Sequence, residues 1–326
     1  MAKKVGTLLE HPIDISVVVV TYCHERYIAT SLDSILAQQT NLKYEILVGD
    51  DASSDQTPEI IRDYAVRYPN VIRPFLRQKN LGASRNIWEL FQHAKGRYIA
   101  ILEGDDYWAD VQKLQKQWEF LEHNESYSGC CGKCLVVDEN DHPDYTQSPQ
   151  FVWNKKIFTM EDYLSTWKLP CQVGSLMFRN RYAQNLVWKD PILYTAHRNV
   201  TDKTLLLLLL CKGPIYCSNE ILSCYRYVTQ KDGKNFFSMH YANPYRNYDM
   251  FMYPCRLETW IRKHLRVKRH IGPRREYRFC RFVEESVREP SAMRIKCVLN
   301  MIMHSHQPAR YLWCVLRTLI EMEEEI

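Results

Sequence analysis

The chain has 326 residues, of which 46% are hydrophobic and 25% charged, and its formal net charge is only +5. This composition is ordinary for a soluble globular protein, and the length suffices for one large or two modest domains. The small net charge argues against a general nucleic-acid binder, and no apolar run reaches the roughly 18 residues of a membrane span.

The cysteine pattern indicates free thiols. Twelve cysteines lie at irregular spacings. The basic start of the chain, Met1 to Lys4, is not followed by the apolar stretch of a secretory signal, so reduced cysteines in a cytoplasmic protein are expected. Cys131 and Cys134 form one C-x-x-C pair, but a structural zinc site needs a second pair at similar spacing, which the sequence lacks.

Strands and helices are predicted to alternate through the first half of the chain. Runs of β-branched and other apolar residues indicate buried parallel strands. Pro74 places one short strand near an edge of the sheet, and Thr57 with Pro58 is typical of a helix N-cap and first turn. The predicted strands are 15–20, 44–49, 71–76, 98–102 and 128–137, and the helices begin near 28, 57, 83 and 114.

This order predicts an α/β fold with an open, mostly parallel sheet and helices on both faces. Ligands of such sheets bind beyond the carboxyl ends of the strands. Three of these ends are polar, namely Thr21-Tyr22, Asp50-Asp51 and Glu103 to Asp106. Their convergence at one edge favours a binding site there.

The acidic cluster formed by Glu103, Asp105 and Asp106 follows a strand that is predicted to be buried. Like charges at this spacing repel, so the cluster needs a cation or shifted pKa values. The simplest partner is a hard divalent metal ion that also binds a phosphate group. The alternative is a solvated acidic turn that caps the following helix.

The second half of the chain is predicted to extend the sheet and then to become helical. A strand at 171–178 follows the polar loop at 138–150, and a helix at 201–211 precedes short strands at 215–216 and 221–225. Basic residues accumulate after about residue 241. We therefore expect an α/β domain at 1–240, with halves at about 13–137 and 150–240, and a basic α-helical region at 241–326.

Four segments together resemble glycosyltransferase family 2, whose members have the GT-A fold. They occur in the family's order, cover residues 15 to about 110, and read ISVVVVTYCHERYIATSLDSILAQ, YEILVGDDASSDQT, NLGASRN and GRYIAILEGDDYW. A weaker match at 201–226 reads TDKTLLLLLLCKGPIYCSNEILSCYR. The resemblance implies a Rossmann-like GT-A enzyme that adds single sugars, since the Q-x-x-R-W string of processive synthases is absent.

By this resemblance, the polar strand ends bind a UDP-sugar donor. Asp51 would accept a hydrogen bond from the uracil imide, Asp50 would contact the ribose or orient the loop, and Arg85 would lie at the base or the phosphates. Strand-end capping by the two aspartates and an exposed first-turn position for Arg85 are the alternatives. The implied nucleotide-binding residues are Thr21, Tyr22, Glu25, Asp50, Asp51 and Arg85.

The resemblance also assigns roles to the acids. The cluster corresponds to the family's D-x-D metal motif with Glu103 in the first position, and Asp105, then Asp106, are the candidates for contact with Mn²⁺ or Mg²⁺ on the donor diphosphate. Asp202, at the start of a predicted helix, corresponds to the general base, which implies inversion at the anomeric carbon. The helix dipole would keep Asp202 ionised, and helix capping is the alternative role.

Two positions depart from the family pattern. Val20 stands where the family often has proline. Tyr225-Arg226 is followed by Tyr227-Val228 where the family often continues to a histidine, so a histidine in the metal site is in doubt and His240 is a distant candidate.

The basic stretch from 262 to 281 carries interleaved Trp260, Ile261 and Leu265. Contact with the anionic inner leaflet of a membrane and a solvated helix face are its two interpretations, whereas nucleic acid is disfavoured because no binding motif accompanies the charge. The hypothesis is a cytoplasmic or peripherally membrane-bound enzyme of surface polysaccharide biosynthesis with a glycan or lipid-linked acceptor. The alternatives are a catalytically inactive GT-A-like binding protein and a nucleotidyltransferase, although residues 21–25 lack the glycine of the latter class.

Overall fold

The computed structural model describes residues 13–146, 154–180, 190–228, 242–272, 274–305 and 307–323. The chain divides into two compact units. The first combines residues 1–160, 169–191 and 199–227, and the second combines residues 161–168, 192–198 and 228–326.

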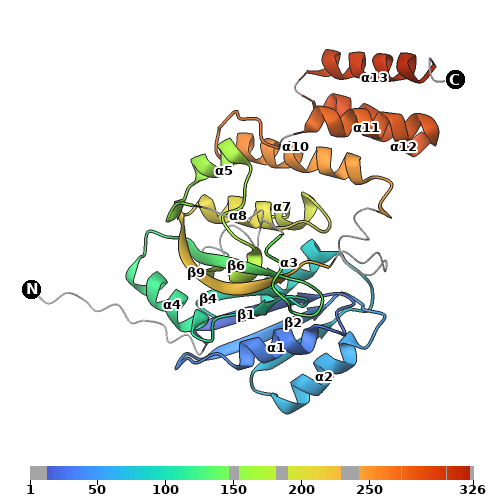
Figure 1. The fold of residues 1–326 in the computed structure, drawn as a ribbon. Helices are drawn as coiled ribbons and strands as arrows, with labels where there is room; N and C mark the ends of the chain where they lie inside the picture. Colours follow the sequence, from blue (N-terminus) through green and yellow to red (C-terminus); the bar gives the residue numbers. More distant parts are fainter. Residues whose placement is uncertain are drawn as a thin grey trace, which may run out of the picture. The chain divides into compact units, whose positions relative to one another are not determined.

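The first unit is built on a mixed sheet with a parallel centre (Figure 1). β1 pairs in parallel with β2 and β4, and β2 pairs with β3, in the order β3-β2-β1-β4-β8-β6-β9-β5. β8 runs antiparallel to both neighbours, β6 is parallel to β9, and β5 and β7 each pair antiparallel with β9. The strands are β1 Ile15–Thr21, β2 Tyr44–Asp50, β3 Ile72–Leu76, β4 Tyr98–Glu103, β5 Tyr107–Trp108, β6 Gly129–Val137, β7 Ile157–Phe158, β8 Met177–Arg179 and β9 Ile215–Arg226.

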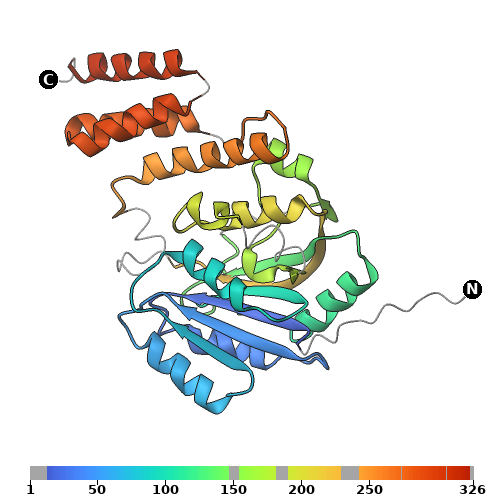
Figure 2. The ribbon, with the colours of Figure 1, turned by 180° about the vertical axis from the view of Figure 1, so that it is seen from behind.

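Side chains alternate between the two faces of the sheet along each strand, and helices pack on both faces. Ile15, Val17 and Val19 of β1 face a core that they share with α1, α2 and α4. The buried Ile87 and Leu90 of α3 lie outside that core, and α3 packs on β1 and β2 from the opposite face (Figures 1 and 2). The helices of this unit include α1 Ile28–Leu36, α2 Thr57–Arg67, α3 Ala83–His93, α4 Lys113–His123 and α8 Asp202–Leu210.

The predicted open, mostly parallel sheet with helices on both faces is confirmed. β3, which contains Pro74, lies at one edge of the sheet as expected. Thr57 is the first residue of α2 rather than its N-cap, and its Oγ1 accepts the backbone N–H of His24 at 2.9 Å.

The prediction of a strand at 171–178 is wrong for most of this segment. The Gln172 side chain accepts the backbone N–H of Gly174 at 2.6 Å and so caps a 3₁₀ turn, η1 Val173–Ser175, before the short strand β8. The two short strands expected at 215–216 and 221–225 are one continuous strand, β9, whose register with β6 shifts around Lys133.

The second unit contains the helices expected for the C-terminal region, and it has a core of its own. Phe251 of α10, Phe279 and Phe282 of α11, Met301 of α12 and Cys314 of α13 belong to this core. No helix among the described residues is long and apolar enough to span a membrane. The helices of this unit are α5 Met160–Thr166, α7 Ile192–Thr195, α10 Arg246–His264, α11 Arg275–Arg288, α12 Ala292–Met303 and α13 Pro308–Glu323. The first residue of α5, Met160, belongs to the first unit.

Candidate functional site

The three polar strand ends lie side by side, because β2, β1 and β4 are adjacent parallel strands. Thr21 pairs with Asp50 across β1 and β2, and Val20 pairs with Glu103 across β1 and β4. The register therefore brings Thr21, Asp50 and Glu103 to the same edge of the sheet, where ligands of parallel α/β sheets bind.

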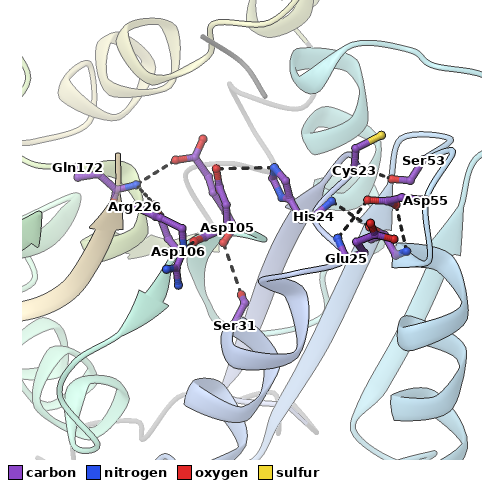
Figure 3. A network of polar contacts seen from close by, with 12 residues as sticks. Cys23, His24, Glu25, Ser31, Ser53, Asp55, Asp105, Asp106, Gln172 and Arg226 are labelled. Atoms are coloured by element: carbon purple, nitrogen blue, oxygen red, sulfur yellow. Dashed lines mark hydrogen bonds and ion pairs between the residues drawn. The ribbon is translucent and has the colours of Figure 1, made fainter. Parts of the chain in front are cut away.

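The loop after β1 is tied to the loop after β2 (Figure 3). The Cys23 N–H donates to Ser53 Oγ at 2.8 Å, and the N–H of the exposed Glu25 donates to the Asp55 carboxylate at 3.1 Å. Cys23 and Ala52 have left-handed φ angles of 57° and 63°, which non-glycine residues adopt at a cost and which recur at functional sites. Glu25 thus holds the loop together, and its contact with a nucleotide stays a prediction.

Asp51 shapes the segment before α3. Its buried carboxylate accepts the backbone N–H groups of Leu81 and Gly82 at 2.7 and 2.8 Å. Gly82 has a φ of 89°, a conformation that favours glycine. These bonds position the segment at the start of α3, and both strand-end capping and the hydrogen bond from uracil to Asp51 stay predictions.

The remaining candidate nucleotide-binding residues also interact with neighbouring side chains or backbone. Asp50 accepts the Ser53 N–H at 3.1 Å and its hydroxyl, and burial raises the pKa of Asp50. Tyr22 is half-buried, and burial raises its pKa, as do the charges of Asp51 and Asp50 to a smaller extent. The Arg85 side chain, 42% exposed, pairs with Glu89 one turn along α3 at 2.9 Å. Their contacts with the donor stay predictions.

Gln172 joins two members of the acidic cluster. Its amide nitrogen donates to the Glu103 carboxylate at 2.9 Å and to the Asp106 carboxylate at 2.6 Å (Figure 3). The other oxygen of Asp106 accepts the backbone N–H of Arg226 at 2.8 Å. Asp106 is buried and has both carboxylate oxygens bonded, so it holds the segments of the site together.

Burial and mutual repulsion raise the pKa values of the acids. For Glu103, burial is followed by the charges of Asp202 and Asp105, which together raise its pKa well above the ordinary value. For Asp106, burial is followed by the charges of Asp105 and Glu103. Asp202, the first residue of α8, therefore lies electrostatically beside the cluster. Burial raises the pKa of Asp202 as well, which opposes the ionising effect expected from the helix terminus.

Asp105 is the open member of the cluster. Its side chain is 30% exposed, and its Oδ2 lies 3.6 Å from Nε2 of His24. Thr21 Oγ1 and His24 Nδ1 are buried, and neither has a hydrogen-bond partner among the described residues. A Cβ on Gly104 would lie 2.7 Å from Thr21 Oγ1 and 3.0 Å from His24 Nδ1, so glycine lets this segment approach the two side chains closely. Unsatisfied buried polar atoms beside an accessible carboxylate suit a polar ligand or ion.

The sequence reasoning assigned no role to Gln172, His24 or Arg226. Arg226 is buried at the end of β9, where its Nε donates to the backbone oxygen of Asp105 at 2.8 Å and its guanidinium lies 4.4 Å from the ring of Tyr27. The sequence match at 201–226 includes Arg226 and could have indicated that it belongs to the site. Gln172 gave no such signal, because it lies in a segment whose apolar residues indicated a strand.

Within the described residues, no group of three His, Cys, Asp or Glu side chains is arranged to hold a metal ion by itself. His240 lies outside the described residues. Cys131 and Cys134 are free thiols, and Cys131 Sγ lies 3.8 Å from Sγ of Cys217 on the paired strand β9.

The sheet, its acidic edge and the C-terminal helices define the GT-A class of fold, and solved structures agree. Residues 1–349 of TarS from Staphylococcus aureus, in complex with UDP-GlcNAc, superpose with a TM-score of 0.59 at 15% identity over 93% of this chain and 82% of that fragment. The mannosyltransferase PcManGT of Pyrobaculum calidifontis, in complex with GDP-Man and Mn²⁺, has a TM-score of 0.51 at 15% identity, with 94% and 80% covered.

The model of glycosyl transferase family 2 matches residues 16–186, and the chain belongs to this family, as the resemblance indicated. The uncharacterized protein Rv1520 of Mycobacterium tuberculosis is 39% identical over 142 residues, which are 44% of this chain and 41% of Rv1520. The putative teichuronic acid biosynthesis glycosyltransferase TuaG of Bacillus subtilis is 28% identical over 222 residues, with 68% and 82% covered. The match to Rv1520 thus spans about two fifths of that protein's length.

Proposed function

We propose that this protein is an inverting, metal-dependent glycosyltransferase that moves one sugar from a UDP-sugar to a glycan or lipid-linked acceptor. The observation that carries the proposal is the mutual influence of the acids: burial and the charges of Asp202 and Asp105 raise the pKa of Glu103, and burial raises the pKa of Asp202. Gathering carboxylates in a partly buried place costs stability, and such clusters are typical of functional sites. A donor diphosphate with its cation and an acceptor hydroxyl would give each carboxylate a partner.

Asp105 is the best candidate to hold Mn²⁺ or Mg²⁺. Its carboxylate accepts no hydrogen bond from the described residues and is accessible, whereas both oxygens of Asp106 are occupied. Glu103 has one oxygen on Gln172 and adds negative charge beside Asp105. This hard oxygen set suits either ion, which when bound would neutralise charge on the departing nucleoside diphosphate.

Asp202 is the proposed general base. A carboxylate whose pKa is raised by burial is a stronger base than an exposed one, which suits removal of a proton from an acceptor hydroxyl. The freed oxygen attacks the anomeric carbon on the face opposite the nucleoside diphosphate, so the new bond forms as the old one breaks and the configuration inverts. The charge of Asp202 raises the pKa of Glu103, which links this base to the donor side of the site.

A place in surface polysaccharide biosynthesis, at the inner face of a membrane, is the proposed setting. The similarity to TuaG, named for teichuronic acid biosynthesis, supports the polysaccharide part. The charge distribution supports the membrane part, because residues 242–326 contain sixteen Lys and Arg against ten Asp and Glu, whereas the rest of the chain is nearly neutral.

The test is a donor panel. The protein is incubated with UDP-, GDP- and dTDP-sugars, with and without Mn²⁺, and both nucleoside diphosphate release and the thermal midpoint are measured. We expect a UDP-sugar to raise the midpoint only with metal, Asp105→Asn to abolish that increase, and Asp63→Asn on the exposed side of α2 to retain it. If no donor binds or is hydrolysed, or if Asp105→Asn behaves as wild type, the proposal is refuted.

A further inference from the structure

His24 is fixed in the loop after β1 by its backbone. Its N–H donates to Thr57 Oγ1 at 2.9 Å, and its carbonyl oxygen accepts the N–H groups of Tyr27 and Ile28, both at 2.9 Å. The preceding residue, Cys23, has a left-handed φ of 57°, a conformation that costs energy in a non-glycine residue and recurs at functional sites. The loop is therefore held in a strained shape, and this shape sets the direction of the His24 side chain.

The imidazole of His24 points towards the carboxylate of Asp105 (Figure 3). The N–H of Gly104 donates to the carbonyl oxygen of Val20 at 2.8 Å, which ties the end of β4 to the end of β1 and brings Asp105 beside the loop. Nε2 of His24 lies 3.6 Å from Oδ2 of Asp105, a separation too long for a hydrogen bond. The two side chains are 16% and 30% exposed, so a small ion can reach them from solvent.

The separation of these two atoms fits two ligands of one metal ion. Bonds from small divalent ions to nitrogen and oxygen ligands are about 2.1 Å long, so two neighbouring ligands of one ion lie roughly 3–4 Å apart. A direct bond between a charged imidazole and a carboxylate, the alternative, would bring the atoms to about 2.7–2.9 Å. The observed 3.6 Å lies within the first range and outside the second.

The second ring nitrogen of His24 also supports a ligand role. Nδ1 is buried and, like Thr21 Oγ1, has no hydrogen-bond partner among the described residues. A histidine that binds a metal ion through one nitrogen carries its proton on the other and donates it to an oxygen. Thr21 is only 3% exposed, and one point beside Gly104 lies 2.7 Å from Thr21 Oγ1 and 3.0 Å from His24 Nδ1. A metal ion at Nε2 would therefore leave the Nδ1 proton near a hydroxyl oxygen that can accept it.

We propose that His24 is a second protein ligand of the donor-site metal ion, beside Asp105, and that its nitrogen makes the site selective for Mn²⁺ over Mg²⁺. The proposal rests on the metal-dependent transfer proposed above and names which of the two ions that function uses. Mg²⁺ binds oxygen ligands and keeps much of its water, whereas imidazole is typical of transition-metal sites. Oxygens of the donor diphosphate and of water would supply the remaining ligands.

The direct test is pulsed electron paramagnetic resonance of Mn²⁺ bound together with UDP. A nitrogen ligand modulates the Mn²⁺ spin echo, so protein that contains ¹⁵N-histidine should show a different modulation pattern from unlabelled protein. This readout needs neither catalysis nor a variant. We expect His24→Ala to abolish the histidine signal, and His123→Gln, at the exposed C-terminal end of α4, to retain it.

Calorimetry of UDP binding tests the selectivity. Wild type should bind UDP more tightly with Mn²⁺ than with Mg²⁺. His24→Ala should weaken the Mn²⁺-dependent binding by about tenfold or more and change the Mg²⁺-dependent binding by less than about threefold. The thermal midpoint of the variant without ligands, expected to stay at the wild-type value, separates loss of a metal ligand from loss of the fold.

Two outcomes overturn this proposal and leave the transferase function in place. In the first, Mn²⁺ binds with UDP but shows no coupling to histidine nitrogen. In the second, His24→Ala weakens UDP binding equally with Mn²⁺ and with Mg²⁺. If the protein binds no Mn²⁺ with UDP, the metal-dependent function proposed above fails as well.

Discussion

Replacing Gln172 with leucine tests whether the acidic cluster is held together as the structure indicates. Gln172 donates to Glu103 at 2.9 Å and to Asp106 at 2.6 Å, and its oxygen accepts the Gly174 N–H at 2.6 Å. Leucine has a similar volume but no polar atom, so all three bonds are lost while the packing is largely kept.

The magnitude follows from these bonds. A hydrogen bond to a charged group contributes about 1.5–3 kcal/mol, and a neutral one about 1 kcal/mol. Allowing for water reaching Glu103, Gln172→Leu should lower the free energy of unfolding by about 3–5 kcal/mol near neutral pH. Part of that loss is recoverable by protonation, because a protonated carboxyl no longer needs the donor.

The sign of the pH dependence is fixed by the raised pKa values. An acid whose pKa is higher in the folded state favours folding at low pH and loses that contribution as the pH rises through the folded value. The Gln172 hydrogen bond lowers the pKa of Glu103, so its removal raises that pKa further. The loss of stability in Gln172→Leu should therefore be larger at about pH 9 than at about pH 5.

Urea unfolding at both pH values measures this difference, and Gln38→Leu is the control. Gln38 is also a buried glutamine, but it donates to the backbone oxygen of Asp110 at 2.8 Å and accepts the Leu114 N–H at 3.0 Å. Because these partners do not titrate, its loss should be the same at both pH values. An equal loss for Gln172→Leu at both pH values would refute the electrostatic account of the cluster.

Three further predictions follow from the same contacts. Asp202→Asn should lower kcat by about 10²–10⁴-fold and leave donor affinity within about twofold, measured by transfer kinetics and calorimetry; a kcat near wild type would exclude the general-base role. His24→Ala, which removes the 3.6 Å neighbour of Asp105, should weaken Mn²⁺-dependent donor binding more than metal-free binding, and equal weakening in calorimetry would contradict this. Lys113 is buried with its pKa lowered to about 7, and its ammonium lies 4.2 Å from the Trp108 ring centre. Folding therefore disfavours its charged form, and Lys113→Met should add about 2–4 kcal/mol of stability at about pH 6 and much less at about pH 9; a pH-independent effect in thermal melts would be contrary evidence.

The parallel part of the sheet could be predicted because its signals are local. The β-branched run in β1 and the apolar periodicity of α1 each lie within one segment, and the polar residues at the ends of β1, β2 and β4 mark where parallel strands finish. Pro74 marked the edge strand for an equally local reason, since it lacks the N–H that an inner strand requires.

The segment at 171–178 could not be predicted from local pattern, since its conformation depends on distant partners. Its apolar residues suit a strand, yet Gln172 turns the backbone through Gly174 and is fixed by carboxylates that lie far away in the sequence. The raised pKa of Asp202 could not be predicted for a related reason. Its position at a helix start is visible in the sequence, but its burial is a tertiary property that no neighbouring residue reveals.

The same dependence on distant segments decides which acid can do which task. Three carboxylates within four residues look equivalent in the sequence, and only their partners separate them. Both carboxylate oxygens of Asp106 accept hydrogen bonds, from Gln172 and from the backbone of Arg226, and one oxygen of Glu103 accepts a bond from Gln172. Of the three acids, Asp105 alone faces His24 and solvent. The bonds that close Asp106 also fix the ends of β9 and the 172–175 turn around the cluster. We therefore expect substitutions of Asp106 to act mainly through stability, and substitutions of Asp105 through the donor.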